Sequence, residues 1–268
     1  MHDLLTEAVR ERLRVRENEG RPQDLYLGAG AEFYEHLVGP DRTEVREVLR
    51  FARDVSGRVL DLAAGGGRLT IPLLRAGHDV AALDLSEDML AHLARAAGAQ
   101  AHLTIHVGDM SDFSLGAEFG LIVIGATSIS LLDARGRRGL LASVRRHLAP
   151  GGRLVFSVPS EPAADALALD SERVIPLSGG GEHYLFSQQA SPSGAERLVN
   201  FVRVADLGRS RDYVPVYTSR LQLVRPSLLQ AELVEAGFAA PEIHAVRSAD
   251  EDPAHRLVLL ATTLTDAP

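Results

Sequence analysis

The chain has 268 residues, 46% of them hydrophobic, with 28 basic and 36 acidic side chains and a net charge of −8. This length and composition can bury a large core as one domain, or as one domain with a cap, and they argue against a disordered chain. The acidic balance disfavours a nucleic-acid partner, which needs a basic face. The absence of cysteine excludes disulfides and thiolate metal sites.

The N-terminal residues show no apolar run of signal-peptide or membrane-spanning length, so we expect a cytoplasmic protein without a membrane partner. Residues 1 to about 20 predict an amphipathic helix with Leu5, Val9 and Leu13 near one stripe. This stripe suits packing or a dimer contact, so a homodimer is one expected state. A second helix is predicted from about Thr43 to Asp54.

From Gly57 onward, apolar strand segments alternate with helical segments, which predicts right-handed crossovers and a mostly parallel sheet. The five expected strands are 58–62, 79–83, 102–107, 121–124 and 153–158. Ser86 is a good N-cap for the helix that continues to Ala97. The fold class is therefore predicted as α/β, a doubly wound, Rossmann-like sheet.

After Pro159 the rhythm changes to β-like segments at 184–187, 197–204 and 216–224, which predict a small antiparallel cap. A helix at 226–236 and strands near 243–247 and 256–263 then predict a terminal antiparallel hairpin on the main sheet. The expected organisation has four parts. These are an N-terminal helical segment covering the cofactor site (1–56), the cofactor-binding core (57–159), the substrate cap (160–224), and the closing helix and hairpin (225–268).

The run from Val59 to Thr70 leads from an apolar strand through a turn of small residues into a helix, as nucleotide-binding crossovers begin. Glycines allow close approach of a ligand, and the amides of the following helix point into the turn. Asp61 at the strand end would repel a pyrophosphate, and Thr70 stands where a phosphate-binding turn has its third glycine. The turn therefore favours a cofactor with an ammonium group, such as S-adenosylmethionine.

Three acids follow three successive strands: Asp61, Asp84 and Asp109. Ligands of doubly wound sheets bind at the carboxyl ends of the strands. Asp84 lies 19 positions after Gly65, the spacing at which an acid accepts both ribose hydroxyls. Asp109 would accept from the adenine amino group, with Met110 packed on the ring.

Four motifs resemble those of class I S-adenosylmethionine-dependent methyltransferases: Asp61 to Gly67, Asp84 to Leu90, Gly108 to Met110 and Leu148 to Gly152. The resemblance departs at Ala63, where a glycine is usual. It implies a cofactor site around the methionine end, ribose, adenine and sulfonium. The resemblance implies Asp61, Ala63, Gly65 and Gly67 at the methionine end and Asp84, Leu85 and Met89 near the ribose. It implies Asp109 and Met110 at the adenine and Ala126 near the sulfonium.

Two narrower resemblances concern the substrate. The motifs that begin at Asp84 and Gly108 are similar to those of the N,N-dimethyltransferases of antibiotic aminosugars. Those enzymes place a pair of tyrosines over the cofactor, and the spacing of Tyr26 and Tyr34 resembles that pair. Asp24 to Tyr34, Glu44 to Leu49 and the glycine turn resemble the methyltransferases of daptide ribosomal-peptide (RiPP) pathways, which dimethylate a terminal amine. Aminosugar enzymes tend to carry a histidine where this chain has Leu131.

An amine acceptor must lose a proton, and a nearby carboxylate, tyrosine or histidine could receive it. The candidate catalytic residues are Glu182, His183, Tyr184, Thr127 and Ser128. The spacing of His102, His106 and Asp109 resembles a set of three metal ligands. The alternation of side chains along a strand accounts for this spacing, so we expect no metal.

The sequence thus predicts S-adenosylmethionine-dependent N-methylation or N,N-dimethylation of a specialised metabolite or small peptide, in natural product biosynthesis. The nearest alternative is an O-methyltransferase of a hydroxylated natural product. A non-enzymatic alternative is a cofactor-binding regulatory or assembly protein, and a third is a dehydrogenase.

Overall fold

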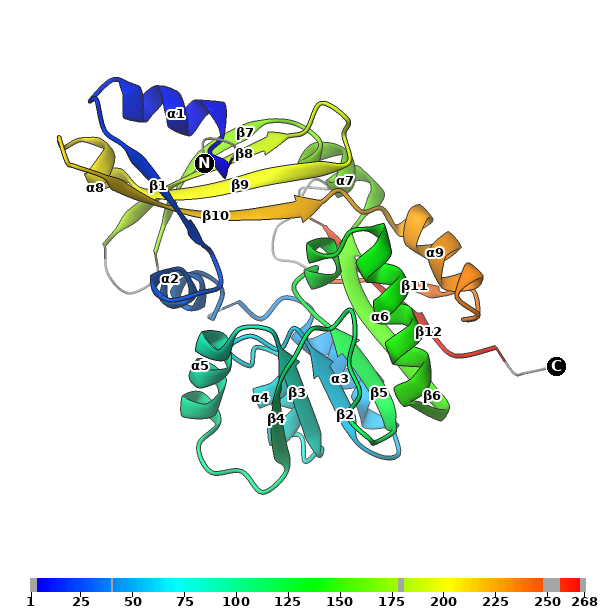
Figure 1. Ribbon diagram of the computed structural model, residues 1–268. Coiled ribbons are helices and arrows are strands. Elements are labelled where there is room, and N and C mark those ends of the chain that lie inside the picture. The colour runs from blue at the N-terminus through cyan, green and yellow to red at the C-terminus, as the bar shows by residue number, and fades with distance from the viewer. Residues whose placement is uncertain (1–3, 40, 178–180, 248–255, 266–268) are drawn as a thin grey trace. The chain divides into compact units, whose positions relative to one another are not determined.

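The structure is a computed structural model that describes residues 4–39, 41–177, 181–247 and 256–265. The chain divides into two compact units, each built from two separate stretches (Figure 1). Unit 1 comprises Met1–Pro40 with Asp165–Leu223, and unit 2 comprises Asp41–Ala164 with Val224–Pro268. The expected N-terminal segment 1–56 is thus divided after Pro40, and its second part belongs to the same unit as the expected core.

Unit 2 contains a sheet with the strand order β11-β12-β6-β5-β2-β3-β4. Strands β2 to β6 run parallel to one another, whereas β12 pairs antiparallel with β6 and β11 pairs antiparallel with β12. This confirms the mostly parallel sheet and the terminal antiparallel pair, whose connection (248–255) lies outside the described residues. The strands are β2 (Val59–Leu62), β3 (Val80–Asp84), β4 (Leu103–Val107), β5 (Phe119–Ile124), β6 (Leu148–Pro159), β11 (Glu242–Ala245) and β12 (Leu257–Thr262).

The strand order determines where this sheet opens toward a ligand. The chain moves outward from β2 through β3 to β4 and then returns to β5 on the other side of β2. The order therefore reverses beside β2, and ligands of such sheets bind at the carboxyl ends of the strands next to the reversal. Asp61 lies in β2, one residue before its end.

Side chains of unit 2 alternate between two cores, as expected for strands covered on both faces. Leu60 and Leu62 of β2 belong to the core that α6 and α9 cover, and Val59 belongs to the core that α3 and α4 cover. Leu90 and Leu93 of α5 pack with Ala82 of β3. The helical segments are α3 (Val45–Arg53), α4 (Thr70–Arg75), α5 (Glu87–Ala97), the 3-10 helix η2 (Ser128–Leu131), α6 (Ala134–His147), α7 (Glu161–Leu167, which crosses the unit boundary) and α9 (Pro226–Glu235).

Unit 1 is built around a second sheet, in the order β1-β10-β9-β8-β7. Its neighbours pair antiparallel except β1, which runs parallel to β10. Leu5, Val9 and Leu13 pack on one face, and Phe33 packs with aromatic side chains on the other. The elements are α1 (Glu7–Arg14), β1 (Gly20–Asp24), α2 (Ala29–Val38), β7 (Ser171–Pro176), β8 (His183–Ala190), β9 (Glu196–Arg203), α8 (Val204–Leu207) and β10 (Val214–Gln222).

Two strands of unit 1 were not predicted, and the first helix is shorter than predicted. The expected helix over residues 1 to about 20 ends at Arg14, and Gly20 begins β1 instead. Neither β1 nor β7 alternates cleanly between buried and exposed side chains, so neither carries the period-two signal that identifies a half-buried strand. The apolar stripe of α1 packs within the chain, which accounts for it without a second copy.

Gly120 in β5 is predicted to be essential for stability. A Cβ there would lie 2.1 Å from the carbonyl oxygen of Ser56, so Gly120→Ala must displace backbone. We expect the free energy of unfolding in urea to fall by about 1–3 kcal/mol. Gly208→Ala is the matched control, because its Cβ would meet the Ala205 carbonyl oxygen at 3.9 Å, an ordinary contact. Equal stability of the two variants would contradict this account of Gly120.

Candidate functional site

Asp61 is a buried carboxylate near the end of β2. Its residue is 2% exposed, and its Oδ2 accepts a hydrogen bond of 2.6 Å from the Thr70 hydroxyl at the start of α4. Burial raises its pKa from 3.8 to about 7, against the opposing effects of the Thr70 hydrogen bond and the nearby Arg68 guanidinium. Thr70 occupies the position at which a phosphate-binding turn has its third glycine, and its hydroxyl donates a hydrogen bond to the Asp61 carboxylate.

The turn after β2 has a backbone that favours small residues. Ala63, Gly65 and Gly67 have φ values of +54°, +54° and +92°, in the left-handed region that L side chains rarely adopt. A Cβ on Gly67 would also lie 2.4 Å from Cδ1 of Leu93. Ala63, where the resembled family usually has glycine, takes the left-handed conformation with a side chain.

Asp84 joins the second strand to this turn. Its Oδ2 accepts from the Gly65 amide and its Oδ1 from the Ser86 amide, each at 2.8 Å. Burial raises its pKa, although the backbone hydrogen bonds oppose the shift. Leu85 follows with an exposed apolar side chain, and Met89 is buried, with its Cε 3.2 Å from where a Cβ of Gly65 would lie. The structure thus brings the expected methionine-end and ribose residues together.

Asp109 follows the third strand of the series. The amide of Gly108 donates to the Asp84 carbonyl at 2.9 Å, so the ends of β3 and β4 lie side by side. Asp109 is exposed and its Oδ1 accepts from the Ser111 amide at 2.7 Å. Met110, expected against the adenine, is buried in the core of unit 2. Asp61 and Asp84 lie within the last two residues of β2 and β3, and Asp109 follows β4, the next strand of the sheet.

The backbone after β5, on the other side of β2, is held by side chains that sequence reasoning did not select. Ala126 and Thr127 have φ values of +52° and +57°. The Ala126 amide donates to Oε1 of Glu44 at 2.7 Å, and the Thr127 amide donates to the Ser157 hydroxyl at 3.0 Å. Ala126 is exposed, and Thr127 and Ser128 are half-buried.

Glu44 and Arg68 form a buried ion pair that the sequence indicated only weakly. The Glu44 side chain is fully buried and that of Arg68 is 11% exposed. Arg68 is the one charged residue between Asp61 and Arg75 in the sequence, which could have identified it. Glu44 stands among other charged residues at the start of a helix and carries no such signal.

The remaining candidates belong to unit 1. Tyr26 and Tyr34 meet edge to face, with ring centroids 5.0 Å apart. The hydroxyl of Tyr184 lies 3.5 Å from Glu182, which also pairs with Arg203 at 3.1 Å. Burial, and then the charge of Glu182, raise the pKa of Tyr184 to about 12.

This pKa disfavours Tyr184 as a base at neutral pH, because its hydroxyl keeps its proton. His183 is exposed at the start of β8. The placement of the two tyrosines over a cofactor stays a prediction.

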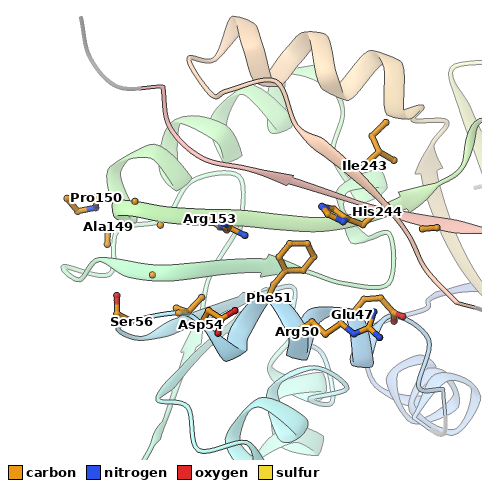
Figure 2. A pocket seen from close by; sticks show the side chains of 15 residues that line it. Glu47, Arg50, Phe51, Asp54, Ser56, Ala149, Pro150, Arg153, Ile243 and His244 are labelled. Atoms are coloured by element: carbon orange, nitrogen blue, oxygen red, sulfur yellow. The ribbon is translucent and has the colours of Figure 1, made fainter.

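A cavity of about 680 Å³ lies near the amino ends of β5 and β6, at the edge of the unit 2 sheet opposite to the strand ends that carry the three acids. Figure 2 shows Phe51 extending from α3 toward His244, whose ring centroid is 5.0 Å away. The side chains that line the cavity carry charges of both signs and include Glu47, Arg50 and Arg153. Its lining contains no predicted site residue.

Neither a metal cluster nor a membrane span is found in the part of the chain that the structure describes. No group of three or more histidine and acidic side chains there could hold a metal ion. His102 instead pairs with Asp79. None of the helices in that part is both long and apolar enough to cross a membrane.

Comparison with known proteins points to one family. A methyltransferase-domain family matches residues 59–152. The dTDP-3-amino-3,4,6-trideoxy-alpha-D-glucopyranose N,N-dimethyltransferase of Streptomyces venezuelae is 34% identical over 48% of this chain and 52% of the relative. A ubiquinone biosynthesis O-methyltransferase of Xanthomonas oryzae is 32% identical over 49% of this chain and 56% of the relative. The chain thus spans about half the length of these curated relatives.

One solved structure is similar over nearly the whole chain. The glycopeptide N-methyltransferase MtfA complexed with S-adenosyl-L-methionine is 32% identical, with a TM-score of 0.65, over 97% of this chain and 98% of that one. The family that the sequence motifs resemble is therefore the family that the comparisons find.

Asp61→Asn is predicted to stabilise the ligand-free protein in a pH-dependent way. The folded-state pKa of about 7 lies above the ordinary 3.8, so between these values the folded protein holds a proton that the unfolded chain has released. The contribution of Asp61 to stability therefore falls as pH rises from about 4 to about 7. We expect the variant to exceed the wild type by on the order of 2–4 kcal/mol at pH 8 and by little at pH 4.5.

Urea unfolding at the two pH values checks this expectation. Asp112→Asn is the control, because that carboxylate is 91% exposed and its removal should change stability little at either pH. A difference between wild type and Asp61→Asn that stays constant with pH would show that Asp61 is ionised normally in the folded protein.

Proposed function

This chain belongs to the S-adenosylmethionine-dependent methyltransferases, and from that membership we propose that it methylates an amine of a specialised metabolite or modified small peptide. The acceptor would gain one methyl group or two. An aminosugar and the free amine of a ribosomal or glycosylated peptide are the two substrate classes we favour. The observation that carries the proposal is the buried Asp61 and the half-buried Asp84 at the glycine turn, in a chain similar along its length to a glycopeptide N-methyltransferase.

The residues of unit 2 fit S-adenosylmethionine, which is the cofactor. Thr70 donates to one oxygen of Asp61, which leaves acceptor capacity for an ammonium group in the turn. Asp84 accepts one backbone amide on each oxygen, and the remaining lone pairs suit ribose hydroxyls. The exposed side chain of Leu85 offers an apolar surface beside them.

The sulfonium of the cofactor supplies an activated methyl group, so the protein has mainly to align the acceptor and exclude water. Asp61 and Asp84 would fix the two ends of the cofactor. Ala126, which is exposed at the end of β5 beside β2, would face the reacting centre. This is positioning rather than covalent catalysis.

An amine acceptor needs only to reach the methyl group in its neutral form, after its ammonium group has lost a proton. Glu182, His183, Thr127 and Ser128 remain the proposed groups that could receive it, directly or through water. Tyr184 is better suited to donate a hydrogen bond, because burial holds its pKa at about 12. Tyr26 and Tyr34 are proposed to cover the cofactor.

A second candidate function is methylation of a hydroxyl group. The observation that favours it is the likeness to the ubiquinone biosynthesis O-methyltransferase. That likeness covers only about half of each chain, whereas the likeness to the glycopeptide N-methyltransferase covers nearly all of both. We therefore place the amine first.

A labelled acceptor screen tests this choice. The protein is incubated with S-adenosylmethionine bearing a trideuteriomethyl group and with a nucleotide-linked aminosugar, a glycopeptide and a short peptide, each with a free amine. We expect mass spectrometry to find one or two labelled methyl groups on nitrogen. The N-acetylated form of each acceptor is the matched control and should stay unlabelled, because its nitrogen lone pair is delocalised.

Two outcomes would contradict the proposal. Label on hydroxyl groups of the N-acetylated acceptors would favour the O-methyltransferase. Binding of S-adenosylhomocysteine without transfer to any amine or phenol would favour a regulatory or assembly protein.

A further inference from the structure

We propose that Glu44 and Arg68 are positioning residues for methyl transfer, which fix the backbone after β5 where the acceptor meets the methyl group. The inference rests on the proposed function. Its physical basis is one buried ion pair that contacts three segments of unit 2: residues 41–45, the glycine turn, and the turn at the end of β5.

The first part of this arrangement is the ion pair itself. Arg68 Nη2 pairs with Glu44 Oε1, and Nη1 donates to the carbonyl of Thr43 at 2.7 Å. The guanidinium therefore ties the end of the glycine turn to the segment before α3. Removing one partner of such a buried pair leaves the other charge without compensation.

The second part is the bond from Glu44 to the turn after β5. The same Oε1 that pairs with Arg68 accepts the Ala126 amide at 2.7 Å. A Cβ on Gly125 would lie 2.9 Å from this oxygen and 3.1 Å from Arg68 Nη2. The pair thus packs directly against the end of β5, and a glycine is required there to admit it.

The third part is local backbone strain. Ala126 and Thr127 are consecutive non-glycine residues in the left-handed region, and Glu44 itself has a φ of +62°. Strained residues persist only where their surroundings enforce them, and they cluster at functional sites. The Glu44 bond to Ala126 and the Ser157 bond to Thr127 supply that enforcement.

Stability alone does not explain the carboxylate. Glu44 Oε2 is buried and has no hydrogen-bond partner among the described residues, and such a group costs free energy. A purely structural site would be served at lower cost by apolar side chains in place of both Glu44 and Arg68. What an apolar side chain could not do is accept the Ala126 amide, so we assign the carboxylate to holding this turn.

Two variants separate the hydrogen bond from the charge. Glu44→Met removes both, whereas Glu44→Gln keeps an oxygen that can accept the Ala126 amide. We expect kcat for the amine acceptor to fall 10- to 100-fold in Glu44→Met, because a small misplacement costs about this much. We expect Glu44→Gln to stay closer to wild type, and the dissociation constant of S-adenosylhomocysteine to change less than about threefold in both.

A second buried ion pair provides the control. Arg137 donates to Glu232 through Nε and Nη2, both at 2.7 Å, and the side chains are 6% and 18% exposed. Glu232→Met removes a comparable carboxylate that does not contact the turn, and should lower stability while leaving kcat unchanged. An equal loss of kcat in Glu44→Met and Glu232→Met would overturn the inference.

A measurement independent of activity completes the test. Hydrogen exchange of the Ala126 amide should be slow in the wild-type protein and in Glu44→Gln, and at least tenfold faster in Glu44→Met. If Glu44→Met does not fold, Arg68→Lys is compared with Arg68→Met, and the lysine variant should retain the greater part of kcat and of amide protection.

Unchanged exchange in a folded Glu44→Met variant, or wild-type kcat in it, contradicts the positioning role. Failure of the wild-type protein to methylate any amine would instead contradict the proposed function. The two failures are therefore distinguishable.

Discussion

Asp61 is a buried carboxylate one residue before the end of β2, and we propose that the cofactor site is arranged around it. Removing this group from water raises its pKa to about 7, because burial disfavours its charged form. Thr70 supplies one hydrogen bond to the carboxylate, and the left-handed turn directly after it brings the Gly65 amide to Asp84. An ammonium group in the turn would stabilise the ionised form of Asp61, whereas a pyrophosphate would oppose it.

The two units differ in the groups that they contain. Unit 2 contains the three acids at adjacent strand ends and the buried pair that holds the turn after β5. Unit 1 contains a cluster of aromatic rings, in which Phe33 packs against Tyr184, Phe201 and Tyr217. Unit 2 therefore contains the predicted cofactor residues of the glycine turn, and the role of unit 1 in holding an acceptor stays a proposal.

The sequence predicted unit 2 well because its signals are local. Apolar strands with acids at their ends, the Ser86 cap and the glycine turn each depend on residues close together in the chain, and the structure contains all of them. Unit 1 was predicted less well because β1 comes from the N-terminal stretch and pairs with β10 from a stretch almost 200 residues later. A pattern of residues close together in the sequence cannot predict such a long-range strand pairing.

The site shows the same limit. Asp61 was predicted from its place at a strand end and Asp84 from its spacing to Gly65, but Glu44 was not predicted, because its contacts with Arg68 and Ala126 join residues distant in sequence. The assignment of Met110 to the adenine came from its place in a motif and stays a prediction, whereas its burial in the core of unit 2 was not indicated by that motif. Burial and long-range contacts therefore supply what residue type and spacing could not.

The most direct test of the central claim is a calorimetric titration with S-adenosylhomocysteine at pH 6, 7 and 8, in buffers of different ionisation enthalpy. If Asp61 has a pKa of about 7 in the free protein and is ionised when the ammonium group binds, affinity should rise about tenfold from pH 6 to pH 8. Binding at pH 7 should also release about half a proton per molecule. Affinity that does not change with pH, with no proton released, would contradict the claim that this carboxylate receives the ammonium end of the cofactor.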